Sequence, residues 1–333
     1  MEALEHLQKQ LAGLKDLRDI VKTMKALSAA SIRQYEHAAE ALADYYRTVE
    51  LGLHAALREA GISAVAELAR PPERSGAGLI VFGSDHGLCG RFNEDVVDQV
   101  VGYVREVQVL DEGSPLGSRS GLHPTSSIPG VVALAGEGQG EGLGDRGRYR
   151  ILAVGARAAG GLEREGLTVE EDLMVPGSAA RITATVQQLL LKIDEWRRES
   201  GISHVMLFYN HPLRRSASHR PVSLRLLPID LRRFKHLEEE PWPSRGVPGF
   251  TLPRPALLTH LLRQYFFVVI SRACADSQAA EHGSRLAAMQ AAEKSLADRL
   301  DEVTMSYRRA RQAVITSELL DVVSGFEAIT QTP

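Results

Sequence analysis

The chain has 333 residues and a net charge of −3 at neutral pH, with 44% hydrophobic and 24% charged residues. These values are typical of a water-soluble folded protein and indicate no general attraction to nucleic acid or anionic membranes. Only two cysteines, Cys89 and Cys274, are present, which excludes a disulfide framework. The longest strongly apolar stretch, Tyr265 to Ile270, is too short to span a bilayer, and the N-terminus does not resemble a signal peptide. We therefore expect a cytosolic protein without direct membrane insertion.

Proline and glycine are concentrated in the middle of the chain. Fourteen of the 15 prolines lie between Pro71 and Pro255, and 24 of the 29 glycines fall in the same stretch. Proline breaks helices and glycine weakens them. The distribution predicts one long helix over residues 1–65, another over 256–330, and a middle region with many turns.

The N-terminal segment carries apolar residues at the alternating three–four spacing of a coiled coil. These residues are Leu4, Leu7, Leu11, Leu14, Val21 and Met24. Arg18 interrupts the series, and a second stripe lies beside it at Leu17, Ile20 and Leu27. Since a helix this long needs a partner, we expect it to pack on another long helix.

The middle region, residues 76–230, alternates between predicted strands and helices. Strands are predicted over 79–82, 149–155, 204–210 and 222–229, and helices over 93–107 and 182–200. Asn93 is the expected N-cap of the first helix, and Gly201 ends the second. This alternation predicts an α/β sheet. Residues 111–148 contain ten glycines and are interpreted as a flexible insertion, and residues 231–255 as a linker.

The turn after the first strand reads GSDHGLCGRFN and allows three interpretations: a catalytic cysteine with its histidine, a phosphate-binding loop, or a tight turn. Asp85, His86 and Cys89 are too close in sequence for an ordinary catalytic triad. The glycine spacing fits neither a P-loop nor a dinucleotide-binding motif. We favour a strand-to-helix turn made by Ser84, Asp85, Gly87, Leu88, Cys89 and Gly90. The histidines show no metal-binding spacing, so neither a metal nor a cofactor is expected.

The C-terminal segment repeats the coiled-coil spacing. Its seam positions are Leu286, Met289, Glu293, Leu296, Leu300, Val303, Tyr307, Ala310 and Val314. The two ends are most simply partners of one another. The predicted fold is therefore an α/β domain inserted between long N- and C-terminal helices that form an antiparallel coiled coil.

Four ordered matches, the C-terminal one made of two stretches, resemble the gamma subunit of F-type ATP synthases. SYRRARQAVITSELLDVVSGFEAI (306–329) and AEHGSRLAAMQAAEKS (280–295) are similar to its C-terminal signature, and DIVKTMKALSAASIR (19–33) to its N-terminal helix. SDHGLCGRFN (84–93) is similar to its central SDRGLCGGLN motif, and 209–229 to a strand–loop–strand segment ending in LLP. Arg91 replaces a family glycine, and the usual glutamate–proline motif before the last helix is absent. These differences indicate a divergent bacterial-type branch.

The resemblance implies a rotor subunit rather than an enzyme. Gamma subunits form the central stalk, which transmits torque between the ion-driven membrane ring and the catalytic hexamer. The implied partners are the alpha and beta subunits, the epsilon subunit and the c-ring. The implied location is the cytoplasmic face of the inner membrane, as a peripheral part of the complex. In this family the α/β domain is the foot that stands on the ring.

The resemblance also implies contact residues. Rotor–hexamer contacts are expected at Met24, Lys25, Arg311, Gln312, Thr316 and Glu318. An apolar bearing is expected at Leu319, Leu320, Val322, Val323 and Phe326. The simpler interpretations are a solvated helix face for the polar group and ordinary seam or core packing for Met24 and the bearing residues.

Two other functions are compatible with the sequence. The first is an independent α/β hydrolase with Cys89 as nucleophile, dimerised by its long helices. The second is a scaffold that uses the helix pair as a spacer. Replacing Cys89 by alanine separates the enzyme from the rotor, because only an enzyme would lose its activity.

Overall fold

A computed structural model describes residues 2–60, 76–111, 149–213, 218–229, 246 and 249–330. The predicted insertion and most of the predicted linker lie outside these residues. The chain divides into two compact units. The larger comprises residues 30–284, and the smaller comprises residues 1–29 together with 285–333.

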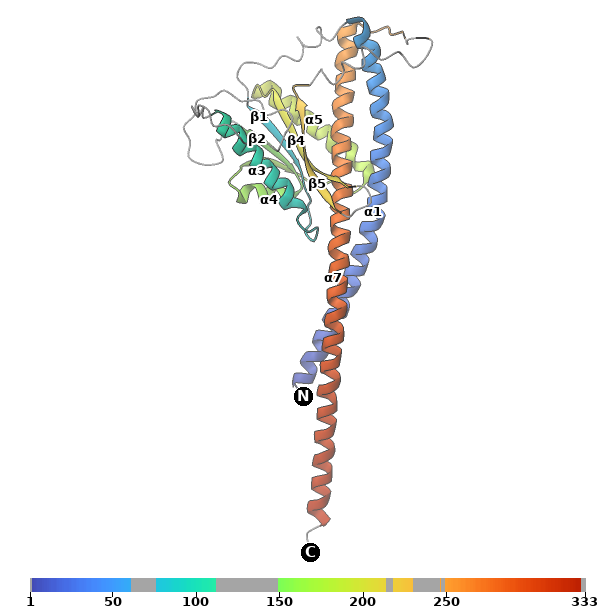
Figure 1. Cartoon of the computed structure of the whole chain (residues 1–333), viewed down its shortest axis with the longest axis vertical. Coiled ribbons are helices and arrows are strands. Elements are labelled where there is room, and N and C mark those ends of the chain that lie inside the picture. Colours follow the sequence, from blue (N-terminus) through green and yellow to red (C-terminus); the bar gives the residue numbers. More distant parts are fainter. Residues whose placement is uncertain are drawn as a thin grey trace, which may run out of the picture. The chain divides into compact units, whose positions relative to one another are not determined.

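The larger unit is built on a five-stranded sheet with the order β3-β2-β1-β4-β5 (Figure 1). Its strands are β1 (Ala77–Phe82), β2 (Tyr149–Val154), β3 (Val169–Leu173), β4 (His204–Pro212) and β5 (His219–Leu227). The first four are parallel, and β5 is antiparallel to β4. The predicted α/β class is confirmed.

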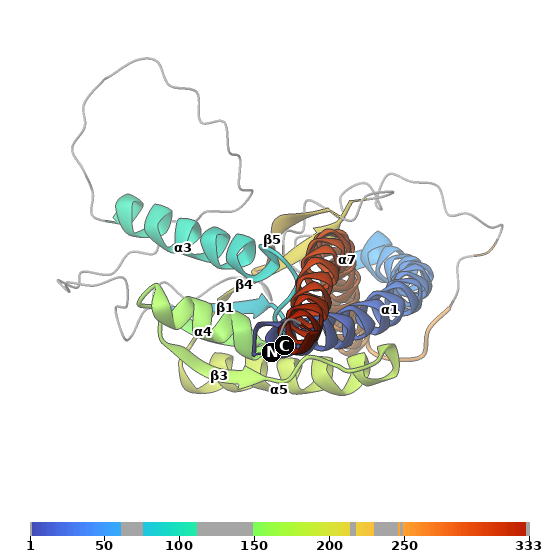
Figure 2. The same ribbon diagram turned by 90° about the horizontal axis from the view of Figure 1, so that it is seen from below.

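Helices cover both faces of this sheet (Figure 2). They are α3 (Phe92–Asp111), α4 (Ala156–Arg164) and α5 (Ile182–Glu199), with the short 3-10 turn η1 (Ala179–Arg181) before α5. Leu79 and Val81 of β1 face the core shared with α3 and α4. Ile80 and Phe82 point the other way, into the core shared with α5. Buried residues alternate between two helical layers, which explains why β1 is a continuous apolar run.

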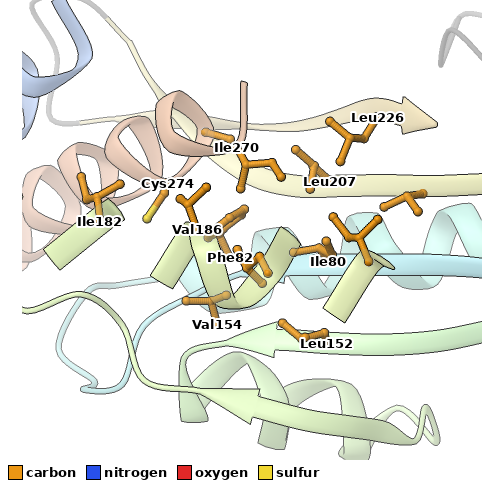
Figure 3. Packing of buried hydrophobic residues seen from close by; sticks show 14 of the residues in the cluster. Ile80, Phe82, Leu152, Val154, Ile182, Val186, Leu207, Leu226, Ile270 and Cys274 are labelled. Atoms are coloured by element: carbon orange, nitrogen blue, oxygen red, sulfur yellow. The ribbon is translucent and has the colours of Figure 1, made fainter. Parts of the chain in front are cut away.

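The second core also contains parts of the two long helices, α1 (Glu2–Ala60) and α7 (Arg254–Thr330). Ile270 and Cys274 of α7 lie against Val186 and the sheet residues Phe82 and Leu207 (Figure 3). Tyr35 of α1 joins the same core, and its hydroxyl donates a 2.8 Å hydrogen bond to the carbonyl of Pro176. The sheet therefore packs directly on the helix pair in this unit.

Within the larger unit, α1 and α7 run antiparallel. Tyr35 stacks on His282, whereas Tyr45 donates a hydrogen bond to Gln264, so the partner's number falls as that of α1 rises. Val49, Leu53 and Leu57 pack with Leu258 and Val268, and with others, in a buried cluster between the two helices.

In the smaller unit the predicted seam positions are the protected ones. Val21, Met289 and Leu296 form a buried cluster with Leu14 and Met24 at its edge. From Leu286 to Val314, every predicted seam position is buried or half-buried, while most positions between them are exposed. By contrast, the second apolar stripe is exposed: Leu17, Ile20 and Leu27. At these positions the predicted spacing and the observed burial agree.

Some local predictions were wrong or incomplete. Helix α3 begins at Phe92, so Asn93 is not its N-cap; its side chain binds the preceding turn instead. Helix α4 and strand β3 were not predicted. Helix α4 is short and contains Gly160 and Gly161, and β3 reads VEEDL, whose three acidic residues are exposed. Strand β3 lies at the sheet edge, where charged residues discourage pairing with other chains.

Glu170 connects the acidic edge strand β3 to the rest of the domain through hydrogen bonds and an ion pair. Its carboxylate accepts hydrogen bonds from Arg150 Nε at 2.6 Å and Trp196 Nε1 at 3.2 Å, and pairs with Lys192 Nζ at 3.1 Å. Burial acts to raise the pKa of Glu170, but the hydrogen bonds from Lys192 and Trp196 and the Arg150 charge outweigh it and lower this pKa. A lowered folded-state pKa stabilises the fold above the unfolded value of 4.5, and this contribution is lost as the pH falls through the folded pKa.

Glu170→Gln should therefore lower the free energy of unfolding by about 1 kcal/mol at pH 7. The difference from the wild type should begin to shrink as the pH falls below about 4.5 and should be lost once the pH passes the lowered folded-state pKa, because the carboxylate of the folded wild type is then protonated as well. Urea unfolding of both chains at several pH values measures it. Asp172→Asn on the same strand serves as the control. A difference that stays constant down to pH 3 would contradict the assignment.

Candidate functional site

The turn after Phe82, which carries the motif SDHGLCG, connects β1 to α3 at the carboxyl edge of the parallel strands. Its Asp85 carboxylate accepts two backbone hydrogen bonds, from Ala156 N at 3.1 Å and from Val175 N at 2.9 Å. Ala156 begins α4 and Val175 follows β3. One side chain therefore joins the ends of three strands, since β2 ends immediately before α4.

Ser84, Cys89 and Asn93 form the inner side of this turn. Ser84 is fully buried; its hydroxyl donates to the carbonyl of His86 at 2.8 Å and accepts from Asn93 Nδ2 at the same distance. Asn93 Oδ1 in turn accepts from the Ser84 backbone N–H. Cys89 Sγ lies 3.6 Å from Ser84 Oγ and is 2% exposed. The side chains of Ser84 and Asn93 thus provide hydrogen-bond partners for each other and for backbone groups of the turn.

The backbone of the turn enters the left-handed region twice, at Leu88 (φ 64°) and at Gly90 (φ 60°). Gly90 explains one glycine of the motif, because such angles favour glycine. Leu88 adopts the same region with a side chain that is 62% exposed. Arg91, which replaces a family glycine, immediately precedes α3 and pairs with Asp95 of that helix at 3.2 Å.

Two glycines that were not predicted as site residues allow the chain segments at this edge to approach closely. A Cβ on Gly83 would lie 2.3 Å from Ala158 Cβ, and a Cβ on Gly155 would lie 2.7 Å from the Ser84 nitrogen. Each glycine immediately follows a buried strand, in the sequences LIVFG and ILAVG. That repeated strand–glycine pattern was the available signal for a close approach of two backbones.

Open α/β sheets bind ligands where the strand order reverses, outside the carboxyl ends of the strands. In this sheet that point lies between β1 and β4. It is filled by protein: Cys89 and Phe92 form a buried cluster with Ala280 of α7. Asn210 at the end of β4, which is also fully buried, donates to the carbonyl of Phe92 at 2.7 Å. Helix α7 thus occupies the usual ligand position.

Cys89 lies in a buried cluster with Phe92 and Ala280. Its Sγ also contacts the side chains of Ser84 and Asn93 and the carbonyl of His86. A reactive thiolate needs an electropositive and partly exposed site. Within the described ranges, no group of three His, Cys, Asp or Glu side chains is placed to hold a metal ion.

The predicted contact residues lie on the long helices. Met24 and Lys25 are half-buried, and Lys25 Nζ pairs with Glu293 Oε2 of α7. This hydrogen bond lowers the pKa of Glu293 and explains a charged residue at a seam position. Arg311, Gln312, Thr316 and Glu318 are all exposed, although the Thr316 hydroxyl donates to the Gln312 carbonyl within the helix.

The predicted apolar bearing residues are exposed on α7. The exposed fractions are 61% for Leu319, 59% for Leu320, 72% for Val322 and 44% for Val323. The side chain of Phe326 lies outside the described residues. Consecutive exposed aliphatic side chains are unusual on a monomeric protein and indicate an interaction surface.

Comparison with known proteins places these features in a family. The family model described as ATP synthase matches residues 3–115 and 132–329. The chain belongs to the ATP synthase family. A relative named ATP synthase gamma chain from Anaeromyxobacter sp. (strain Fw109-5) is 27% identical and covers 99% of this chain and 100% of its own length. The ATP synthase gamma chain of Salinibacter ruber is 25% identical over 100% of both.

Solved structures share the fold. A chain of the Euglena gracilis mitochondrial ATP synthase rotor is 16% identical, with a TM-score of 0.57, and the match covers 94% of this chain and 99% of that one. A chain of the OSCP/F1/c-ring assembly from the same organism has a TM-score of 0.59 at 15% identity, covering 98% and 95%. Long N- and C-terminal helices that pack together around an α/β sheet are thus features of this family's fold.

Proposed function

We propose that this chain is the central-stalk rotor subunit of an F-type ATP synthase. The observation that carries the proposal is the family match along nearly the whole chain. The long helices are consistent with it, since α1 has 59 residues and α7 has 77. A long helix satisfies its own backbone hydrogen bonds and is stiff enough to transmit torque. The chain itself is non-catalytic, and the buried setting of Cys89 gives no support to the hydrolase alternative.

The partners follow from the same function. The alpha and beta subunits surround the helices, and the α/β domain stands on the c-ring together with the epsilon subunit. A rotating shaft presents different side chains to each identical catalytic subunit in turn. Each subunit is thereby biased toward a different conformation, which is allosteric coupling through differential contacts.

We further propose that the two long helices form an antiparallel coiled coil. The alternating three–four burial along α1 and α7 and the Lys25–Glu293 pair between them support it. Arg311, Gln312, Thr316 and Glu318 then contact loops of the hexamer, as Met24 and Lys25 do along α1. Their exposed positions leave them accessible for charge-assisted hydrogen bonds.

The location follows as a proposal from the assembly. The complex places this chain at the cytoplasmic face of the inner membrane, as a peripheral subunit. In the part of the chain that the structure describes, none of the helices carries a stretch apolar enough to cross a membrane.

Reconstitution tests the function. The chain is co-expressed with the alpha and beta subunits encoded beside it, and ATP hydrolysis is assayed with and without it. A stable assembly with one copy of this chain and multi-site turnover that depends on it are expected. A chain that purifies alone, or as a dimer indifferent to those subunits, would contradict the rotor function.

Cys89→Ala separates the rotor from the enzyme. Turnover of the reconstituted complex should stay within about twofold of the wild type, while the free energy of unfolding should fall by about 1 kcal/mol because a small buried side chain is truncated. Cys274→Ala, which truncates the other buried thiol, is the control. A loss of activity specific to the Cys89 variant would revive the hydrolase alternative.

A further inference from the structure

Helix α7 is largely buried over the stretch that packs against the α/β domain. From Ile270 to Ser284, most of its residues are less than a tenth exposed. The apolar members of this stretch are mostly small: Ala273, Cys274, Ala275, Ala279 and Ala280. Small side chains make shallow ridges, and apolar contact is not directional. Directional contacts across this interface are therefore the ones that specify a single rotational setting of the helix.

A histidine makes a directional contact across this interface. His219 of β5 places Nε2 3.1 Å from Asp95 Oδ2 of α3 and Nδ1 2.9 Å from Ser284 Oγ of α7. Its side chain is only 9% exposed, and its ring packs edge-on against Phe92. In the tautomer with the proton on Nε2, that nitrogen donates to the carboxylate, and Nδ1 accepts from the serine hydroxyl. One imidazole thus connects three elements.

The neighbouring strand makes a second contact of the same kind. His211 Nδ1 lies 3.1 Å from Asp276 Oδ2 of α7, and the residue Asp276 is 7% exposed. Arg272 Nε, one turn earlier on the helix, lies 4.0 Å from the same oxygen. Burial raises the pKa of Asp276, although the His211 and Arg272 charges act against it. A buried carboxylate needs such partners, because leaving it unpaired is costly.

These two contacts hold α7 at separate points. The strands that carry them are paired, with His211 opposite Arg220 and Pro212 opposite His219. On the helix, the contacted residues Asp276 and Ser284 are about two turns, or roughly 12 Å, apart. A rod that is held at two separated points cannot turn or slide without breaking at least one contact.

We define the clasp as Asp95, His211, His219, Asp276 and Ser284. We propose that the clasp makes the α/β domain and helix α7 turn as one body, so that its residues position the shaft for torque transmission. The inference rests on the proposed rotor function. The clasp residues are positioning residues: they contact neither nucleotide nor transported ion, and act by fixing the rotational setting of α7.

The two buried cysteines can be used to measure how often α7 separates from the α/β domain. Cys274 lies on α7 against the sheet, and Cys89 packs against Ala280. Both thiols are shielded by the packing that the clasp holds in place. Their rate of modification by a maleimide, measured on the full-length chain, therefore reports how often α7 separates from the α/β domain.

The main variant is His219→Leu combined with His211→Leu, which removes both contacts. His219→Gln retains a donor in place of Nε2 and should partly rescue. His37→Leu alters an exposed histidine whose pairing with Glu40 is solvent-accessible, and is the matched control. Ser284→Ala removes only the hydrogen bond to His219, and it replaces the double variant in the experiment if the double variant does not fold.

Two quantities are measured: maleimide labelling of the chain, and ions pumped per ATP hydrolysed by the complete complex in vesicles. The double variant should label about tenfold faster, the change that corresponds to a loss of about 1.4 kcal/mol from the two contacts together. Its pumping ratio should fall at least about twofold, while ATP hydrolysis continues. His219→Gln should lie between the double variant and the wild type, and His37→Leu should match the wild type.

Faster labelling with an unchanged pumping ratio would overturn the proposal, because the clasp would then only stabilise the fold. Unchanged labelling would overturn it as well, whatever the complex does. If the wild-type chain does not assemble with its partners, the rotor function fails instead, and the labelling arm still decides whether the clasp holds the helix.

Discussion

Replacing Gly155 by alanine is expected to lower the free energy of unfolding by about 3 kcal/mol or more, combining backbone strain with overpacking. Gly155 follows β2 and precedes α4 with φ 118° and ψ 118°, a conformation that residues other than glycine rarely adopt. The added Cβ would also lie 2.7 Å from the Ser84 nitrogen and 2.8 Å from the Gly83 carbonyl carbon. Those are backbone atoms, which cannot rotate away as a side chain would.

Urea unfolding followed by circular dichroism measures this effect. Gly160→Ala is the matched control, because Gly160 lies in the same short helix with no heavy atom within 4 Å of the added methyl. That change should be neutral or stabilising by up to about 1 kcal/mol, since alanine is the better helix former. If both variants are equally stable, β1 and β2 are not joined by a close backbone approach at this edge.

Replacing both Leu319 and Leu320 by aspartate is expected to weaken assembly with the hexamer at least tenfold while leaving the isolated chain folded. Both side chains are about 60% exposed and so contribute little to folding. If the hexamer buries them, each contributes about 1.5–3 kcal/mol of transfer free energy, and burying charge in their place is unfavourable. A loss of about 1.4 kcal/mol already corresponds to a factor of ten.

Co-purification with the alpha and beta subunits and rotor-dependent ATP hydrolysis test the bearing. Ser317→Asp adds a charge in the same turn without removing an aliphatic side chain, and should have little effect. Normal assembly and turnover of the leucine variant would contradict the bearing while leaving the central-stalk function in place.

The point between β1 and β4 where the strand order reverses is occupied by side chains of the protein itself. In many α/β proteins this crevice holds a ligand, whereas here Ala280, Cys89 and Phe92 occupy it. The position that elsewhere provides a binding site thus serves to seat a helix. A sheet whose carboxyl edge packs against α7 is suited to a mechanical function.

The features that the sequence determined are those written in local patterns. The heptad spacing at the two ends of the chain, and the confinement of every proline except Pro333 to the middle region, defined both long helices. The continuous apolar run of β1 and the amphipathic pattern of α5 defined two layers of the α/β domain. Such patterns depend on neighbours a few residues away, and the family signatures are of the same local kind.

The features that only the tertiary structure decided depend on contacts between distant residues. Strand β3 has no alternating pattern, because it is a charged edge strand. Asp85 bonds with Ala156 and Val175, which are 71 and 90 residues away. His219 meets Asp95 and Ser284 across 124 and 65 residues. A histidine in a strand and an aspartate in a turn are unremarkable in sequence, because their partners are chosen by the packing of α3 and α7 against the sheet.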